Sequence, residues 1–340
     1  MKKKLFIISS EKIYSNNGNF FCDNLDMKST PEGLEKYYDI KVIAKKTLIP
    51  RAHKIKIRFV SIFSNLFTYI IEIIKSSKQK DTQFLMISLS PYTLTACIFL
   101  RCFGKKPFLY LRSNGYEEYK IILGFLGYII YHLMFSIASK ISTLISCRKF
   151  ILRNERGFTV SPSQLDHSWK QNITTPSFEK RKLIYVGRIR KEKGIFSLLE
   201  IIKDLPEINL TLIGAEKDFY KPINNYKNIE VINILNNQKE LINLYDKNDI
   251  MILPSYTEGY PMVVLEALSR ERPIIIFKEI EHIIGNLKGI FVAERNSKSL
   301  ISKIDYIKIN YDSIQRSMKK NNLPTNSDFI KQLKEILLKN

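Results

Sequence analysis

The sequence of 340 residues is about twice as long as a typical domain of roughly 150 residues, so it predicts two domains and excludes a disulfide-stapled mini-protein. Its 45% hydrophobic and 26% charged residues are ordinary for a globular protein and exclude a mainly disordered chain. The 54 Lys+Arg and 33 Asp+Glu residues give a net charge of +21, which makes nucleic acid, a membrane surface and phosphorylated small molecules the partners to consider.

Strand-like and helical segments alternate through the first half of the chain, which predicts a parallel sheet covered by helices. The apolar run after Met1 is too short for the core of a signal peptide and is predicted to form the first strand. The expected strands of this half are 5–9, 39–44, 84–89, 107–112, 142–146 and 157–161, and the expected helices lie near 55–77, 91–103 and 118–139.

One segment of this half, residues 121–138, is nearly all apolar between Lys120 and Lys140. As a helix it would be roughly 27 Å long at about 1.5 Å per residue, close to the thickness of a bilayer core. A strand is expected on each side of it, and a helix that crossed the membrane would separate those strands. We therefore favour a helix that is at least partly buried in the domain over one that lies on the bilayer, with a spanning helix least favoured.

The alternation begins again after a polar segment, residues 161–180, which contains two prolines and lacks periodicity. This segment is predicted to connect two domains. In the second half the expected strands are 182–187, 209–214, 230–234, 249–254, 273–277 and 289–293, and the expected helices are 195–205, 238–247, 261–270, 297–309, 311–320 and 326–338.

A short basic loop follows the first strand of the second half. The sequence VGRIRKEKG (186–194) ends the strand at Gly187, contains four basic residues and precedes a helix. Gly187 would let a ligand approach the backbone, and the helix N-terminus adds free N–H groups and a positive dipole end. These features are typical of a diphosphate cradle, with a solvated basic loop as the alternative. Neither the P-loop pattern nor G-x-G-x-x-G occurs here, so a nucleotide would be bound by another scheme.

A second loop, in DIMILPSYTEGYP, also joins a strand to a helix. Pro261 suits the first helical position and has no N–H, so the free donors there are the amides of Met262 and Val263. Glu258 lies in the turn and Glu266 lies inside the helix. A carboxylate in such a helix suits the two hydroxyls of a ribose, which makes Glu266 the candidate ribose ligand. Ordinary surface charge is the alternative for both glutamates.

The block YDKNDIMILPSYTEGYPMVVLEALSRERPII resembles the signature of the retaining GT-B glycosyltransferases of family four, the group 1 glycosyltransferases. Their E-x7-E pair matches Glu258 and Glu266. VGRIRKEKG, about seventy residues upstream, resembles the diphosphate loop of the same family. The similarity is strong over roughly 182–275, and elsewhere it rests on the order of strands and helices.

The resemblance implies a role for each matching residue. Arg188 and Lys193 would neutralise the donor diphosphate, Glu266 would bind the ribose and Glu258 would face the donor sugar. As the sugar–phosphate bond breaks, negative charge grows on the diphosphate, and fixed cations and helix-start amides stabilise it. We therefore predict Glu258, Arg188 and Lys193 as catalytic residues and expect no metal, because no Asp-x-Asp motif is present. The predicted donor site consists of Gly187, Arg188, Lys193, Gly259, Met262, Val263 and Glu266.

The sequence departs from the family pattern in three places, which leaves the donor sugar open. Glu271 stands where the family usually has a glycine, and KEIEHIIGNLKG (278–289) replaces a glycine-rich turn on the donor-sugar side. After the first strand only Gly18 is available to approach the donor. In the loop after the fourth strand, Arg112 and Asn114 are weaker catalytic candidates, and no first-domain histidine can be aligned.

The predicted fold class is α/β, with two doubly wound Rossmann-like domains of the GT-B type facing across a cleft. An acceptor-binding domain is expected over 1–165, a connection over 166–181 and a nucleotide-sugar-binding domain over 182–322. The helix in 323–340 is expected to be able to return to the first domain.

The predicted function is transfer of a sugar, of the hexosyl type, from a UDP-, GDP- or ADP-linked donor to a glycan or lipid-linked acceptor. By the resemblance, anomeric configuration is retained and the setting is bacterial polysaccharide, capsule or lipopolysaccharide biosynthesis. No cofactor beyond the donor co-substrate is expected. The alternatives are a basic nucleic-acid-binding protein, which only the charge supports, and a non-catalytic GT-B scaffold.

The location expected from the sequence is cytoplasmic. The four cysteines show no metal-ligand spacing, which predicts reduced thiols. Residues 1–178 contain 27 basic and 12 acidic side chains, so most of the positive charge lies in the first half. RAHKIKIR (51–58), followed by an apolar run over 60–74, could form an amphipathic cationic surface on the inner face of the cytoplasmic membrane. A solvated basic turn followed by a core helix is the alternative.

Overall fold

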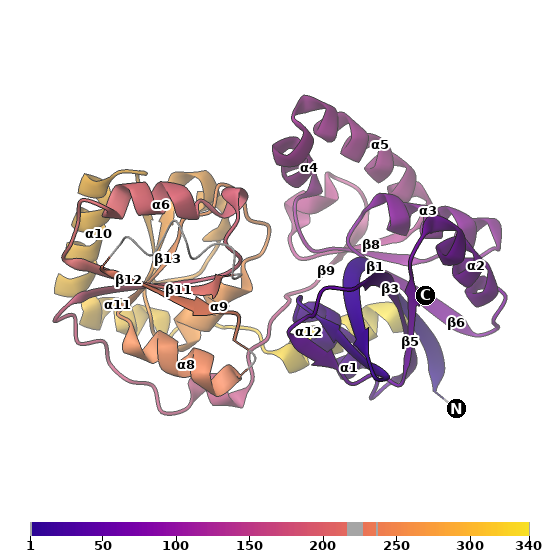
Figure 1. Cartoon of the computed structure of the whole chain (residues 1–340), viewed down its shortest axis with the longest axis horizontal. Helices are drawn as coiled ribbons and strands as arrows, with labels where there is room; N and C mark the ends of the chain where they lie inside the picture. Colours follow the sequence, from indigo (N-terminus) through magenta and orange to yellow (C-terminus); the bar gives the residue numbers. More distant parts are fainter. Residues whose placement is uncertain (1, 216–226, 236, 340) are drawn as a thin grey trace. The chain divides into compact units, whose positions relative to one another are not determined.

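The chain folds into two α/β units in a computed structural model that describes residues 2–215, 227–235 and 237–339. The first unit comprises Met1–Pro162 together with Asn326–Asn340, and the second comprises Ser163–Thr325. Each unit contains one sheet and its own buried core (Figure 1).

The sheet of the first unit is parallel apart from a small antiparallel extension. Its parallel strands lie in the order β5-β3-β1-β6-β7-β8-β9. After a register shift that follows Ile8, β1 still pairs with β3 as far as Tyr14, and its last residues also pair with the antiparallel strand β2, which pairs with β4. The strands are β1 (Lys3–Asn16), β2 (Asn19–Cys22), β3 (Tyr38–Thr47), β4 (His53–Ile55), β5 (Phe59–Phe63), β6 (Thr82–Ile87), β7 (Phe108–Leu111), β8 (Thr143–Ser146) and β9 (Gly157–Thr159).

Helices cover both faces of this sheet, because consecutive side chains of β1, which point to opposite faces, are all buried from Leu5 to Ser9. Leu5 and Ile7 of β1 share a buried cluster with Phe329 and Leu333 of the C-terminal helix α12. Figure 1 shows α1 and α12 on one side of the sheet and α2, α3 and α5 on the other. The helices are α1 (Asp26–Leu34), α2 (Leu66–Ser77), α3 (Pro91–Cys102), α4 (Gly115–Leu123), α5 (Phe125–Ile141) and α12 (Asn326–Leu338).

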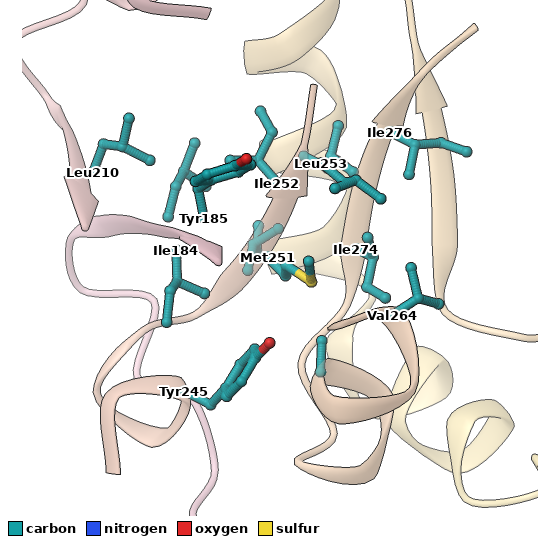
Figure 2. Close-up of a cluster of buried hydrophobic side chains, with 14 of the residues drawn as sticks. Ile184, Tyr185, Leu210, Tyr245, Met251, Ile252, Leu253, Val264, Ile274 and Ile276 are labelled. Carbon is teal, nitrogen blue, oxygen red and sulfur yellow. The ribbon is translucent and has the colours of Figure 1, made fainter. Parts of the chain in front are cut away.

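The sheet of the second unit is entirely parallel, with the strand order β12-β11-β10-β13-β14-β15. The strands β13, β14 and β15 are continuous apolar runs, as expected where helices cover a parallel sheet on both faces. Figure 2 shows part of the resulting core, built from side chains of β10, β13 and β14 with Tyr245 and Val264 from neighbouring helices. The strands are β10 (Arg181–Val186), β11 (Ile208–Ala215), β12 (Ile229–Asn233), β13 (Ile250–Leu253), β14 (Ile274–Phe277) and β15 (Ile290–Ala293), and the helices are α6 (Ile195–Ile202), α8 (Gln238–Lys247), α9 (Met262–Ser269), α10 (Ser297–Ile309) and α11 (Tyr311–Met318).

Two sequence predictions about helices of the first unit were wrong, and one helix was not predicted. The helix expected near 55–77 begins only at Leu66, because Asn65 caps it, and the residues before it form β4 and β5. The helix expected over 118–139 is divided into α4 and α5 at Gly124, whose φ of 65° ends the first helix. α1 was not predicted, because Pro31 lies inside it.

The basic run 51–58 is therefore not part of an amphipathic helix. It forms β4 and the turns beside it, and the Arg51 guanidinium pairs with the Asp23 carboxylate. Lys54 and Lys56 are exposed. Membrane contact through this run remains a prediction, but the run is not helical and is separate from the helix α2 that follows it.

The segment predicted as a connection, 166–181, packs instead onto the second unit. Leu165, Trp169 and Phe178 are buried in the core of that unit. The two units divide between Pro162 and Ser163, and the chain returns to the first unit at Asn326. The segment looked like a linker because its partners lie about 100 residues further along the chain, where no local pattern reveals them.

Candidate functional site

The strand order of the second unit defines where a ligand can bind. From β10 the chain proceeds outward through β11 to β12, and it then returns to β13 and proceeds the other way to β15. The order therefore reverses between β10 and β13, and open parallel sheets bind ligands beyond the carboxyl ends of the strands at such a point. The loops that leave these two strands, 187–194 and 254–261, are the two in which the sequence predicts a nucleotide site.

Glycines bring the backbones of the two loops into contact. Gly194 has a φ of 67°, and a Cβ there would lie 1.9 Å from the carbonyl oxygen of Pro254. The Tyr256 amide donates to the carbonyl of Glu192 at 3.0 Å. Gly187, with a φ of 154°, follows β10 directly, and the Tyr185 hydroxyl donates to the carbonyl of Arg188. The basic loop is thus held by its backbone, and the Arg188 side chain is exposed.

Lys193 and Glu258 form an ion pair between the loops. The Lys193 Nζ lies 2.8 Å from Oε1 of Glu258, and the Ser255 hydroxyl donates to the same oxygen at 2.7 Å. The Glu258 carboxylate is nearly buried, and the Lys193 side chain is about one-fifth exposed. Two predicted catalytic residues that lie 65 positions apart in the sequence therefore touch.

The start of α9 leaves amides free for a ligand. Pro261 is the N-cap residue rather than the first helical residue, and no side chain caps the helix. Met262 and Val263 are the first residues of the helix, and amides at these positions have no partner within a helix. Together with the dipole of α9, they favour a negative charge at this point.

Glu266 lies further along α9 and is buried. The Tyr245 hydroxyl of α8 donates to Oε2 of Glu266 at 3.0 Å. Burial raises the pKa of Glu266 to about 7, and the hydrogen bond from Tyr245 opposes this only in part. The phenol is itself buried and lies edge-on to Trp169 at a centroid distance of 5.8 Å. Glu266 is thus held in one orientation at a pKa near neutrality.

Three residues of this region were missed by the sequence analysis. Ser255 binds the Glu258 carboxylate, and His282 Nε2 donates to the Glu258 carbonyl at 2.9 Å. The Arg295 guanidinium donates to the carbonyl of Pro254 at 3.0 Å and lies 4.2 Å from the ring centroid of Tyr256. Ser255 directly follows a strand, which is a usable signal. His282 and Arg295 follow other strands, and only the fold brings them here.

In the first unit, Arg112 is surrounded by acidic partners. Its guanidinium lies 3.3 Å from Asp26 Oδ2 and 3.4 Å from Glu11 Oε1, and it donates to the Ser88 hydroxyl. Burial alone would lower the pKa of Arg112, but the two carboxylates outweigh burial and raise it. Arg112 thereby connects the ends of β6 and β7 with β1 and the start of α1, and its catalytic role remains a prediction.

The other first-unit candidates have local structural roles. Asn17 and Gly18, both with positive φ, form the turn of the β1–β2 hairpin, so Gly18 does not directly follow the central part of β1. Asn114 is the N-cap residue of α4, and its carbonyl accepts from the amides of Glu117 and Glu118. Donor contact by Gly18 and catalysis by Asn114 remain predictions.

The described residues contain neither a metal-binding cluster nor a membrane-spanning helix. Within 2–215, 227–235 and 237–339, no group of three or more His, Cys, Asp or Glu side chains could hold a metal ion. No helix in the same ranges is both long and apolar enough to cross a membrane.

The two Rossmann-like units and the site at the switch point define the class of protein: it has the GT-B fold. This chain is similar in structure to HepE of Anabaena, which was solved in complex with UDP and glucose. The similarity covers 99% of each chain, with a TM-score of 0.72 and 13% sequence identity. Residues 169–323, most of the second unit, match the family model of the glycosyl transferases group 1.

Curated relatives are similar mainly over this second unit. An uncharacterized glycosyltransferase of Methanocaldococcus jannaschii is 28% identical over 146 residues, which are 41% of each chain. A putative teichuronic acid biosynthesis glycosyltransferase, TuaC of Bacillus subtilis, is 28% identical over 37% of this chain and 32% of its own. The chain thus matches about two fifths or less of the length of these two curated relatives.

Proposed function

We propose that this protein is a glycosyltransferase that moves a sugar from a nucleotide-sugar donor to an acceptor. The observation that carries the proposal is the Lys193–Glu258 pair beside the start of α9, at the switch point of a unit that matches the group 1 family model. UDP is the first nucleotide to test, because the structurally similar HepE binds it.

The donor site follows from the charges and free amides of this region. The diphosphate lies against Lys193, Arg188 and the amides of Met262 and Val263, and the ribose hydroxyls meet Glu266. When the sugar–phosphate bond breaks, the leaving diphosphate gains negative charge, which these groups stabilise without reorganising. Lys193 then exchanges part of its contact with Glu258 for a phosphate oxygen, and Glu258 faces the sugar.

The acceptor, the setting and the location belong to the same proposal. The acceptor is a glycan or a lipid-linked molecule bound by the first unit, in bacterial polysaccharide, capsule or lipopolysaccharide assembly. The similarity to TuaC, a putative teichuronic acid biosynthesis glycosyltransferase, supports such a setting. Transfer proceeds with retention and without a metal. The protein works in the cytoplasm, peripherally on the inner face of the membrane.

The donor site is tested by calorimetry with UDP, GDP and ADP. We expect one nucleotide to bind, and we expect Lys193→Met and Glu266→Ala each to weaken it at least tenfold. Lys191→Met is the matched control, because Lys191 carries the same charge in the same turn but is exposed. Equal loss in the control, or no nucleotide binding by the wild type, contradicts the proposed site.

The enzyme itself is tested by screening nucleotide sugars for donor hydrolysis. Turnover of one donor, lost in Glu258→Gln, supports transfer and identifies the sugar. Nucleotide binding without turnover of any donor would indicate a non-catalytic scaffold instead. Binding of nucleic acid with a steep dependence on salt, and of no nucleotide, would favour a nucleic-acid-binding protein.

A further inference from the structure

The hairpin of α4 and α5 exposes an unusual amount of apolar surface. At the corner where the helices meet, Ile122 is 72% exposed, Phe125 is 75% exposed and Leu126 is 67% exposed. Soluble proteins rarely expose several large apolar side chains in succession. We name this surface the apolar tip, and it consists of Ile121, Ile122, Leu123, Phe125 and Leu126.

The outward face of α5 extends the apolar tip along the helix. The inward face packs through Tyr131, Phe135 and Ala138, which are buried. A surface helix normally carries polar residues opposite such a face, and α12 does so with exposed Ser327, Asp328, Lys331 and Glu335. The outward face of α5 instead exposes Ile129, Ile130, Leu133 and Ile137. An α-helix that is apolar on both faces usually has its outward face covered as well, by other protein or by lipid.

Basic side chains surround this apolar face. No charged residue occurs from position 121 to 139, whereas the hairpin and the segment after it, residues 115–156, contain six basic and three acidic residues. The Arg153 guanidinium lies 4.4 Å from the ring centroid of Tyr116 in α4, and Ser139 of α5 donates to Glu155. The segment 149–156 therefore lies beside the hairpin. The exposed basic residues of this rim are Lys120, Lys140, Lys149, Arg153 and Arg156.

We propose that the apolar tip and the outward face of α5 dock onto an anionic lipid bilayer. Apolar side chains at a helix corner enter the boundary of the acyl region, and Lys and Arg beside them stay at the level of the acidic headgroups. Basic residues outnumber acidic ones around a charge-free apolar face, and this net positive charge matches an anionic partner. Figure 1 shows α4 and α5 stacked as a hairpin on the side of the sheet that also carries α2 and α3.

This docking surface deepens the peripheral location proposed above and rests on it, but it does not depend on the donor site. UDP affinity measured on the same variants separates the two. Lost vesicle binding with unchanged nucleotide affinity concerns only the docking surface, and the reverse concerns only the donor site.

The first experiment is co-sedimentation of the full chain with vesicles of phosphatidylcholine, with and without phosphatidylglycerol. The tip variant replaces Ile122, Phe125 and Leu126 by Ser, and the matched control replaces Leu48 and Ile309, which are 82% and 81% exposed elsewhere. We expect the wild type and the control to bind the anionic vesicles and the tip variant to bind at least tenfold more weakly. Lys120→Glu with Lys140→Glu weakens binding, as does added salt.

A second experiment keeps the proposal testable if the tip variant folds poorly. The chain has a single tryptophan, Trp169, which is buried in the second unit and gives a constant background. Tryptophan at position 125, introduced as Phe125→Trp, is expected to shift to shorter emission wavelengths on anionic vesicles and to be quenched by brominated lipid. Ile309→Trp shows neither change.

Three results overturn the proposal. The wild type does not bind anionic vesicles, or the tip variant binds them as the wild type does, or Phe125→Trp is not quenched by brominated lipid. If the wild type is a dimer that the tip variant converts to a monomer and neither binds vesicles, the face is an interface between copies of this chain.

Discussion

A buried carboxylate at the centre of the candidate site determines how this protein responds to pH. Glu266 has a pKa of about 7 in the folded chain against an ordinary value of 4.5, because burial disfavours its ionised form. The folded state therefore binds more protons than the unfolded state between these two values. The contribution of Glu266 to the free energy of unfolding is therefore complete below about pH 4.5, and it is lost as the pH rises through 7.

Glu266→Gln is expected to remove this loss. The amide carbonyl of Gln can accept the Tyr245 hydrogen bond without ionising. Relative to the wild type, the variant should gain on the order of 3 kcal/mol of unfolding free energy between pH 4.5 and pH 8, from about 1.4 kcal/mol for each unit of pKa shift. Urea unfolding of both proteins across this range measures the gain. Parallel pH profiles would mean that Glu266 titrates normally.

A single glycine sets the spacing of the two site loops. A Cβ on Gly194 would lie 1.9 Å from the Pro254 carbonyl oxygen and would also require a left-handed backbone. Gly104 has a similar φ of 72° with nothing within 4 Å, so Gly104→Ala is a matched control that measures backbone strain alone. We expect the control to cost about 1 kcal/mol and Gly194→Ala to cost at least about 2 kcal/mol more. Equal midpoints of thermal unfolding for the two variants would show that the loops can separate without a loss of stability.

At the scale of elements, two buried arginines hold the segment before β10 on the second unit. The Arg270 guanidinium donates to the backbone carbonyls of Trp169, Gln171 and Asn172 and pairs with Asp246 at 2.5 Å. Arg272 binds the carbonyl and hydroxyl of Thr174. The segment contains no helix or strand signal of its own, yet these contacts give it a fixed path.

Arg270→Met is expected to destabilise the second unit by about 3–5 kcal/mol. The variant leaves three carbonyls without their donor and leaves the partly buried Asp246 carboxylate with Arg272 alone, at 3.5 Å. The free energy lost in this way exceeds what burial of the apolar Met side chain provides. Arg316→Met on α11 is the control, because Arg316 is exposed and its loss should change stability by less than about 0.5 kcal/mol. The midpoint of Trp169 fluorescence in urea reports the effect, and similar midpoints for both variants would contradict it.

These elements also show what can be predicted from the sequence. Most strands of the second unit contain an apolar run bounded by turn residues, so the fold and the two site loops were predictable. The sequence predicted that Lys193 and Glu258 belong to the same site, but it did not predict that their side chains form an ion pair. Arg270, His282 and Arg295 contact partners that are distant in the sequence, so no local pattern reveals them. The strand β5 was missed because its pairing with β3 outweighs a weak local signal, and α1 was missed because it contains Pro31.

At the scale of the whole molecule, the chain crosses between its units twice. α12 follows the second unit in sequence, but it belongs to the first, where Phe329, Leu333 and Leu337 are buried. The Gln83 side chain donates to the Leu337 carbonyl at 2.7 Å, and the Ser161 amide donates to Gln332 at 2.7 Å. The first unit therefore requires both ends of the chain, and the second unit is closed within the middle of the sequence.

Leu333→Ala tests this division. Leu333 is fully buried in the core of the first unit, so its truncation should cost that unit about 2–5 kcal/mol. Because Trp169 lies in the second unit, tryptophan fluorescence reports the unfolding of that unit, whereas circular dichroism reports both. We expect an earlier transition by circular dichroism and an unchanged midpoint by fluorescence. Ile304→Ala, in the core of the second unit, should move the fluorescence midpoint instead. If Leu333→Ala moves both signals equally, the two units unfold as one and α12 is a structural element of the whole chain.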